Sequence, residues 1–532
     1  MSERRRLLVI ADRVHAPGSP AADASQAVLI EADRIVSIGP ADVLRASHAR
    51  AEIIDLRGTV ITPGLCDAHI HLTDWAVART EVDLAGAESP EAAAGAVAMA
   101  AAGRADGSWV RGRGWNPHLW GGRQPDRRLL DHAVPGRPVA LQSHDMHALW
   151  ASSRALEVAG IDEGTADPDG GRIVRAADGM PTGLLLENAA CLVTDVMPVP
   201  RFAEMQDLVH QAQAALHRLG VTAVHSLPGI LVPDPDPLPI LESLRAADRL
   251  RVRVLHHIAL ARLDDAVRIG LRSGFGGQWI RIGGVKMFLD GALGSRTAWM
   301  RAPYLTQDGC GIRMMQPRAF RDLVAFAAAH GIATTVHAIG DAAVELAFEV
   351  LASVEARGAA IPHRIEHVQC CPPHVMANAG STGVICSVQP CHLITDWRAA
   401  EEHWGAERAA GTYAFASLLR GGATLAFGSD APVEPADPRL GLFAAVHRRD
   451  LRGEPEEGWH MGEALSPAEA LAGYTTGPAA AAGLVGLLGT LQPGAFADLV
   501  AWDRDPVTAG RDGLLDTRCV ATLVGAELVY SD

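Results

Sequence analysis

The chain of 532 residues is 48% hydrophobic and 20% charged, which is ordinary for a globular enzyme and allows one large barrel with additions or two to three units. A formal charge of −15 argues against nucleic acid as a partner, because a phosphate backbone needs a basic face. The 8 cysteines are scattered without a CxxC pair, and no stretch has transmembrane length without a charge or a Pro/Gly break, so we expect free thiols, no membrane contact and a cytoplasmic location.

Both ends of the chain have the pattern of short β-strands. The first apolar run stops at Asp12, too soon for a signal peptide or a membrane span. Four further segments share β-branched residues, polar alternation and turn residues. They are 26–40, 51–64, 495–506 and 519–530. We therefore predict one small β-sandwich made from residues 1–62 and 489–532. The alternative is two unrelated β extensions.

The middle of the chain alternates between short apolar strands and Ala-rich stretches with helical spacing, such as 320–331. The eight predicted strands are 65–72, 221–226, 253–260, 284–290, 333–339, 364–369, 383–390 and 424–430. Because helical candidates lie between most of them, the pattern predicts an α/β fold with a closed (β/α)8 barrel of the TIM type. Residues 63–74 supply the first barrel strand in this interpretation, and residues 206–488 supply the remainder.

The gap between the first two predicted barrel strands is too long for a single crossover. Residues 75–205 contain their own helix and strand signals, with clusters of Trp, Pro and Gly. We therefore predict that this segment is an inserted subdomain over the mouth of the barrel.

A pair of histidines, His69 and His71, ends the first predicted barrel strand. Alternate residues of a strand point to the same face, so both imidazoles are expected to aim at one point inside the barrel. Taken alone the pair is weak evidence, since two histidines this close also occur as ordinary polar residues.

Four more candidate metal ligands, Lys286, His337, His367 and Asp430, lie near predicted carboxyl ends of strands, where barrel enzymes place catalytic groups. Lys286 stands within an apolar strand, where a bare ammonium is expensive to bury. Histidine, carboxylate and a modified lysine suit Zn²⁺ or a similar divalent ion. Any one of these residues could be structural, but the full set on successive strands predicts a metal site.

The candidate ligands lie within longer motifs. These are PGLCDAHIHL at 63–72, VKMFLDGALGSRTA at 285–298, VHAIGDAA at 336–343, RIEHVQ at 364–369 and FGSDAPVEPADP at 427–438. With them the chain resembles the amidohydrolase superfamily, and within it amidohydrolase family 3, the branch that contains N-substituted formamide deformylases. Segments 141–161 and 170–187 resemble the long insertion of that family, and 489–506 its returning C-terminal segment. The resemblance spans nearly the whole chain.

The resemblance implies that His69 and His71 bind one ion and that His337 and His367 bind another. Lys286, N-carboxylated by CO₂, would bridge the two ions. A carbamate replaces an unpaired buried cation by a metal-bound anion, which suits an apolar strand. The expected metal is Zn²⁺, with one or two ions; a mononuclear site with an unmodified Lys286 is the alternative.

The resemblance gives Asp430 a bond to the first ion and the role of proton shuttle, so Asp430 and Lys286 are the expected catalytic residues. Metal-activated hydroxide would attack a carbonyl, and Asp430 would pass the proton to the leaving nitrogen. We expect a hydrolase that cleaves an amide-type C–N bond of a small molecule, such as an N-substituted formamide. The alternatives are a heterocycle deaminase, a cyclic-amide hydrolase and a non-catalytic scaffold, against which the intact ligand set argues. A homodimer is the family-level expectation.

Five further residues are candidates for substrate contact. His147 and Trp115 lie in the insertion, and Asp290, Arg296 and Gln389 lie at or just beyond strand ends. Trp115 could form an aromatic pocket wall or belong to a small core of the insertion. Asp290 and Arg296 could instead pair with each other and shape their loop.

Overall fold

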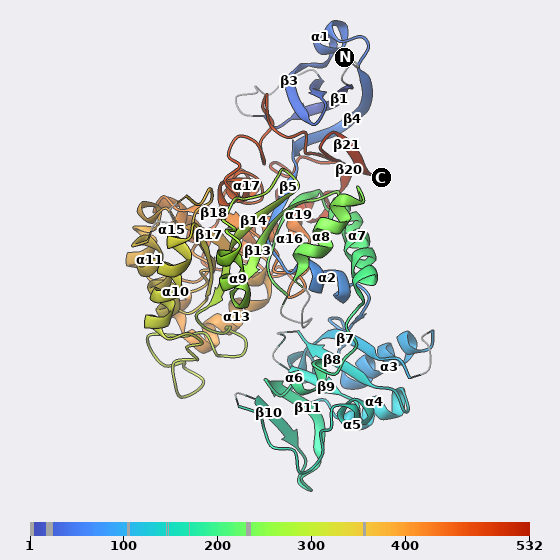
Figure 1. Cartoon of the computed structure of the whole chain (residues 1–532), viewed down its shortest axis with the longest axis vertical. Coiled ribbons are helices and arrows are strands. Elements are labelled where there is room, and N and C mark those ends of the chain that lie inside the picture. Colours follow the sequence, from blue (N-terminus) through green and yellow to red (C-terminus); the bar gives the residue numbers. More distant parts are fainter. Residues whose placement is uncertain are drawn as a thin grey trace. The chain divides into compact units, whose positions relative to one another are not determined.

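The computed structural model describes residues 5–16, 25–103, 107–144, 146, 148–169, 171–229, 236–354 and 358–532, and Figure 1 labels its helices and strands. The chain forms two compact units. The barrel unit contains Met1–Leu72, His210–Pro228 and Asp236–Asp532. The inserted unit contains Thr73–Val209 and Gly229–Pro235.

Eight parallel strands of the barrel unit form one sheet. They are β5 (Leu65–Ile70), β12 (Val221–Ser226), β13 (Arg253–Ala259), β14 (Ile280–Phe288), β15 (Thr334–Ala338), β16 (Arg364–His367), β17 (Ile385–Val388) and β18 (Thr424–Phe427), neighbours in this order. A parallel bridge between Ile70 and Ala431 joins the end of the first strand to the loop that follows the last strand, and the amide of His71 donates to the carbonyl of Ala431 at 2.9 Å. The sheet is therefore a closed ring, and the predicted (β/α)8 barrel is confirmed.

Helices between the strands bury their apolar faces against the sheet. Val324 of α10 (Pro317–Ala329) and Leu346 of α11 (Asp341–Ala352) share a buried core with Val285 of β14. Other helices of this unit are α1 (Ala41–Ser47), α8 (Pro237–Ala246), α9 (Leu263–Arg268), α12 (Pro373–Met376), α13 (His392–Trp404), α14 (Ala406–Ala409), α15 (Phe415–Arg420), α16 (Pro438–His447), α17 (Pro467–Gly473), α18 (Thr476–Ala481) and α19 (Gly510–Asp516). Helices α2 (Leu72–Ala78) and α7 (Phe202–Arg218) run from one unit into the other. Within the described ranges, every helix is too short or too polar to span a bilayer.

Several barrel strands end earlier than their sequence pattern predicts. β18 ends at Phe427, three residues before Asp430, and β17 ends at Val388, one residue before Gln389. The chain leaves the sheet where the apolar run gives way to polar residues. Asp430 and Gln389 therefore lie in loops at the carboxyl ends of the strands, where barrel enzymes carry their functional groups.

Strands from both chain ends form a second sheet of the barrel unit. In spatial order they are β21 (Glu527–Ser531), β20 (Cys519–Val524), β19 (Leu499–Trp502), β4 (Glu52–Pro63), β1 (Arg6–Val14), β2 (Gln26–Glu31) and β3 (Arg34–Pro40). β19 pairs antiparallel with β4, with Leu499 opposite Pro63. Val9, Ile30 and Leu523 share one buried core with Leu499, so the two chain ends fold together. All seven strands are hydrogen-bonded in one sheet that both chain ends build.

Deleting the chain after Leu488 should make the protein insoluble. The deletion removes β19, β20 and β21, leaves β4 without its partner, and exposes core side chains such as Val9 and Ile61 to water. The deletion also removes Asp498, to which Nε of Arg253 donates at 2.6 Å. The buried guanidinium of Arg253 is then left without its carboxylate partner. The measurements are soluble yield and melting temperature.

A chain that ends at Ala526 is the matched control for this deletion. It loses the edge strand β21, whose side chains are exposed or half-buried, and the exposed Asp532, so it should stay soluble. If the chain that ends at Leu488 is equally soluble and melts at an unchanged temperature, the two ends do not stabilise each other.

The inserted unit has a sheet and a core of its own. Its strands, in spatial order, are β10 (Gly171–Arg175), β11 (Pro181–Glu187), β9 (Ala148–Ala151), β8 (Val139–Ser143), β7 (Val110–Trp115) and β6 (Val82–Asp83), and its helices include α3 (Pro90–Ala101), α4 (Arg127–Ala133), α5 (Ser153–Val158) and α6 (Cys191–Thr194). The ring centre of Trp115 lies 5.6 Å from that of Trp120 and 6.5 Å from that of Trp150. The insertion after the first barrel strand is thus a separate packing unit. Its predicted place over the barrel mouth stays a prediction.

Candidate metal centre

Three buried side chains meet at the carboxyl ends of β5 and β18. His69 lies in β5, His71 follows that strand, and Asp430 lies in the loop after β18. Nε2 of His69 is 3.2 Å, and Nε2 of His71 3.4 Å, from Oδ1 of Asp430. One ligand atom from each residue lies within 4.8 Å of the other two. This spacing suits a single divalent cation.

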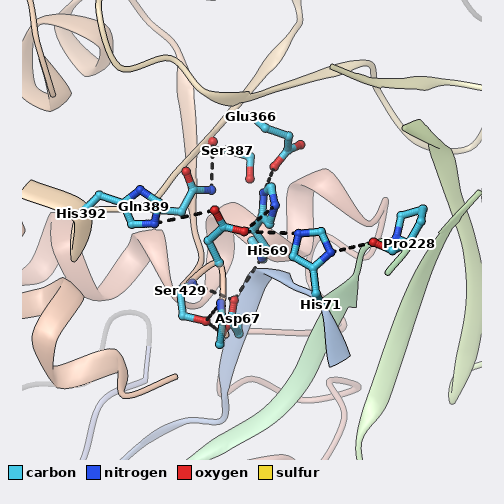
Figure 2. A network of polar contacts seen from close by, with 12 residues as sticks. Asp67, His69, His71, Pro228, Glu366, Ser387, Gln389, His392 and Ser429 are labelled. Carbon is cyan, nitrogen blue, oxygen red and sulfur yellow. Dashed lines mark hydrogen bonds and ion pairs between the residues drawn. The ribbon is translucent and has the colours of Figure 1, made fainter. Parts of the chain in front are cut away.

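The opposite nitrogens of the two imidazoles are held by hydrogen-bond acceptors. Nδ1 of His69 lies 2.5 Å from Oε2 of Glu366, and Nδ1 of His71 lies 2.6 Å from the carbonyl oxygen of Pro228 (Figure 2). When Nδ1 carries the proton and donates it to these acceptors, each Nε2 presents its lone pair toward the carboxylate of Asp430. The surroundings therefore orient both imidazoles as metal ligands.

Arg364 keeps Glu366 charged inside the barrel. Nη2 of Arg364 donates to Oε2 of Glu366 at 2.8 Å. The same nitrogen donates to the carbonyl of Ala68 at 2.6 Å and to the hydroxyl of Ser387 at 2.7 Å. Burial by itself raises the pKa of Glu366, but Arg364 and His69 hold it well below its usual value. Glu366 is therefore an anion that fixes the tautomer of His69.

A second group of possible ligands shares Asp430. His367 ends β16 and His392 begins α13, and one ligand atom from each lies within 4.8 Å of the others and of Asp430. Nε2 of His392 is 3.7 Å from Oδ2 of Asp430. The ring centre of His367 lies 5.0 Å from that of His69 and 4.5 Å from that of His337. The imidazoles therefore form one buried cluster around a shared carboxylate.

Lys286 borders this cluster from β14. Its Nζ lies 4.8 Å from the ring centre of Phe288. Burial lowers the pKa of Lys286 to about 8, although the carboxylates of Glu366 and Asp430 act in the opposite direction. The amine is thus close enough to both carboxylates to interact with them electrostatically, as a residue at the edge of the site should.

His337 borders the cluster from β15. Its Nε2 lies 3.1 Å from the carbonyl oxygen of Gly291, an arrangement in which Nε2 carries the proton and Nδ1 keeps its lone pair. Burial, helped by the charge of Lys286, lowers the pKa of His337 to about 3. The ring is therefore neutral near pH 7, which is the form that binds a metal.

Two of the site residues have left-handed backbone conformations that a side chain disfavours. φ is 73° at His367 and 62° at Asp430. Such conformations cost on the order of 1–3 kcal/mol each and concentrate at functional sites. At His367 the conformation breaks the alternation of β16. Glu366 and His367, neighbours in sequence, consequently both face the cluster.

The donor set fits a divalent cation. Burial lowers the pKa of His69, but Asp430 and Glu366 more than offset this and raise it, so the site attracts positive charge. Nε2 of His69, Nε2 of His392 and Nδ1 of His367 are buried and make no hydrogen bond within the described part of the chain. Imidazole nitrogens and carboxylate oxygens are ligands that Zn²⁺ and similar ions prefer. A cation would satisfy these atoms together.

Asp290, a predicted substrate contact, makes hydrogen bonds to the backbone of neighbouring loops. Its carboxylate is fully buried and accepts hydrogen bonds from three backbone amides. They belong to Trp299, Ile339 and Gly340. Burial raises the pKa of Asp290 to about 7, and its Oδ1 lies 3.6 Å from Nε2 of His337. These contacts, and not a pairing with Arg296, occupy the carboxylate, so Asp290 anchors the loop after β14.

The other predicted substrate contacts are scattered. Nε1 of Trp115 donates to the carbonyl of Leu141 at 2.8 Å within the tryptophan core, which favours the core interpretation over a pocket wall. Arg296 is half-buried in the loop after β14. Gln389 is buried, and its Oε1 makes no hydrogen bond to any described residue. His147 lies outside the described residues. Substrate contact by these residues stays a prediction.

Sequence reasoning did not select Glu366, Arg364 or His392. It chose only His367 from strand 364–369. A glutamate and an arginine in an otherwise apolar strand need partners when buried, and this pattern could have indicated the pair. His392 stands two residues after the predicted strand 383–390. A histidine at that place is the same signal that selected Asp430.

Comparison with known proteins places these features in context. Protein LONG AFTER FAR-RED 3 of Arabidopsis thaliana is 31% identical over 523 residues, covering 95% of this chain and 88% of that protein. N-substituted formamide deformylase of Arthrobacter pascens is 29% identical over 560 residues, covering 100% of this chain and 99% of that enzyme. The crystal structure of an uncharacterized metal-dependent hydrolase from Pyrococcus horikoshii has a TM-score of 0.77 at 28% identity, covering 94% of this chain and 98% of that one.

A closed barrel whose strand ends gather imidazoles around one carboxylate defines a metal-dependent hydrolase. The profile described as the amidohydrolase family matches residues 52–530, nearly the whole chain. The protein belongs to this family, in the branch known as amidohydrolase family 3, and is a metal-dependent amidohydrolase.

Proposed function

We propose that this amidohydrolase cleaves an amide-type C–N bond of a small molecule, and that N-substituted formamides are the first substrates to test. The observation that carries the proposal is the convergence of His69, His71 and Asp430, with Oδ1 of Asp430 at 3.2 and 3.4 Å from the two Nε2 atoms. The 29% identity to a formamide deformylase over the full length of both chains supports the choice of substrate.

In this proposal His69 and His71 would hold a divalent ion through their Nε2 atoms. A bound ion would supply the Lewis acid that acidifies water and polarises a carbonyl. Asp430 accepts the proton of the attacking water and later gives it to the leaving nitrogen, which a carboxylate with two separately placed oxygens can do. Glu366 accepts a hydrogen bond from Nδ1–H of His69, so the imidazole keeps one tautomer during the reaction.

We also propose that Lys286 acts as an N-carboxylated ligand and that the ion is Zn²⁺. Lys286 is the only lysine in the sequence, and every other long basic side chain is an arginine. Arginine stays protonated at neutral pH, whereas a buried lysine loses its proton readily and can then react with CO₂. Imidazole-rich donor sets favour Zn²⁺ among the divalent ions that cells supply.

Chelation tests the proposed function most directly. Removing metal with a chelator should abolish hydrolysis, and adding Zn²⁺ or Mn²⁺ should restore it. In the proposed mechanism only the ion lowers the pKa of the attacking water. The assay is release of formate and amine from a panel of N-substituted formamides. Full activity in thoroughly metal-free protein would remove the metal from the mechanism.

The same panel separates substrate classes when it includes simple amides, lactams and aminoheterocycles. Release of ammonia from an aminoheterocycle would indicate a deaminase. Ring opening of a lactam would indicate a cyclic-amide hydrolase. Either result, with no turnover of formamides, would reject the formamide proposal and keep the metal chemistry.

A further inference from the structure

His392 directs its imidazole at Asp430 from the first turn of α13. Its Nε2 lies 3.7 Å from Oδ2 of Asp430, and the residue is buried with 8% of its surface exposed. In Figure 2, His392 and His71 approach the centre of the site from opposite sides. The family resemblance assigns no role to His392, so its place in the cluster needs an explanation of its own.

The two oxygens of Asp430 face different imidazoles. Oδ1 lies 3.2 Å from Nε2 of His69 and 3.4 Å from Nε2 of His71, whereas Oδ2 faces His392. A separation of 3.7 Å is too long for a hydrogen bond. Ligand atoms about 2.05 Å from one tetrahedral ion lie roughly 3.3 Å apart, so the distances of 3.2 and 3.4 Å match neighbouring ligands of one cation, and the distance of 3.7 Å fits two ligands at a wider angle. The carboxylate is thus placed to serve two cation positions.

His367 supplies the next donor on the His392 side. Its ligand atom lies within 4.8 Å of those of His392 and Asp430. The two rings are nearly parallel, with centres 6.1 Å apart and planes at 27°. Nδ1 of His367 and Nε2 of His392 are buried, and neither has a hydrogen bond to the residues that the structure describes. Two such buried nitrogens, on residues whose ligand atoms lie within 4.8 Å of a carboxylate oxygen, form a built site for a cation.

Gln369 can hold the far side of the His392 ring. Its side-chain amide nitrogen lies 3.4 Å from Nδ1 of His392, while its Oε1 has no hydrogen bond among the described residues. Amide oxygen and nitrogen can exchange places by rotation of the amide group. With Oε1 toward the ring, Nδ1–H donates to it and Nε2 keeps its lone pair, which is the arrangement seen around His69 and His71.

We propose that His392 is a metal ligand, and that it forms with His367 and Oδ2 of Asp430 a second cation position beside the one at His69 and His71. This inference rests on the proposed metal-dependent function and extends it by one ligand. It makes Asp430 a carboxylate shared by two ions. Lys286 and His337 are then additional ligands of the second ion, beside His367, His392 and Asp430.

The test is metal stoichiometry of the full-length protein, read by elemental analysis and by titration with Co²⁺ followed by its visible absorption. Wild-type protein should saturate at about two equivalents per chain. His392→Phe keeps a ring against His367 but removes both nitrogens, so it should hold about one equivalent and lose part of the Co²⁺ absorption. The affinity for the second ion should fall at least 10- to 100-fold, the loss expected when even a supporting residue is removed.

His363→Phe is the matched control. His363 is also buried in this unit, directly before β16, and its Nδ1 bonds to the amide and hydroxyl of Thr334 rather than to the cluster. This variant should keep two equivalents. If His392→Phe does not fold, His392→Gln, which fills less space and stays polar, is measured in the same way.

The outcomes separate the inference from the proposed function. A His392 variant that still binds two ions with wild-type affinity and an unchanged Co²⁺ spectrum overturns the inference. Wild-type protein that saturates at a single equivalent and is active also overturns it, and leaves the proposed function standing. Wild-type protein that is active without binding any ion rejects the proposed function itself.

Discussion

Asp430→Asn should lower turnover at least about 100-fold while the protein keeps the ion at His69 and His71. Asparagine preserves the size of the side chain and one oxygen, but it cannot accept and return a proton. Burial by itself raises the pKa of Asp430, but His69 and His71 hold it well below its usual value, so the wild-type side chain is an anion. A general base contributes on the order of 10²–10⁴-fold to a rate.

Glu434→Gln is the matched control for this substitution. Glu434 lies four residues further along the same loop, and burial raises its pKa to about 8, so at pH 7 it is mostly neutral already. Its Oε1 accepts a hydrogen bond from Thr395 at 2.8 Å, which a glutamine oxygen can also accept. Turnover should therefore stay near the wild-type rate. The measurements are the turnover rate and the metal content of both variants, and near-normal turnover of Asp430→Asn would remove the proton shuttle.

The barrel could be predicted from the sequence because its strands are short apolar runs at regular spacing. β12 has the predicted bounds, Val221–Ser226. Strand ends were less accurate: β18 stops at Phe427, and Asp430 lies beyond it. The pattern of apolar residues reports burial, and it does not report where the last ladder hydrogen bond forms.

The parts of the site that escaped prediction depend on backbone conformation and on partners far away in sequence. Alternation along a strand places Glu366 and His367 on opposite faces, but at His367 φ is 73°, which breaks this alternation, and both side chains contact the cluster. His392, in the first turn of α13, faces Asp430 in the loop after β18. No local sequence pattern predicts the backbone conformation of His367 or the contact of His392 with Asp430.

Residue type alone also fails to separate a pocket wall from a core, or a substrate ligand from a structural carboxylate. Trp115 donates its indole N–H to a backbone carbonyl inside the inserted unit. Asp290 accepts three backbone amides and has no exposed surface. Both roles follow from tertiary contacts that the sequence does not display. The hydrogen-bond partner, and not the residue type, decides between them.

Lys286→Ala should lose metal as well as activity, in contrast to Asp430→Asn. A fall in the pKa of Lys286 from its usual 10.5 to about 8 raises the fraction of neutral amine at pH 7 roughly 300-fold. The neutral amine is the form that CO₂ carboxylates, and the carbamate adds an anionic ligand from a strand whose residues next to Lys286, Val285 and Met287, are apolar. Without it the imidazoles must hold the ions with one negative charge fewer.

The sole lysine makes this substitution unusually easy to interpret. In wild-type protein equilibrated with ¹³C-labelled bicarbonate, a carbamate carbon that resists dilution of the label and is absent from Lys286→Ala can come only from this side chain, because the other primary amine is the chain terminus in both proteins. Short carboxylic acids should restore part of the metal and part of the turnover of Lys286→Ala by supplying a substitute anion.

Lys286→Arg is the matched control: it keeps a long cationic side chain that cannot be carboxylated, so it should be as defective as alanine and should respond less to added acid. Elemental analysis and turnover are measured for both variants with and without acid. A Lys286→Ala protein that holds wild-type amounts of metal removes the bridging role and leaves the imidazoles and Asp430 as the whole ligand set.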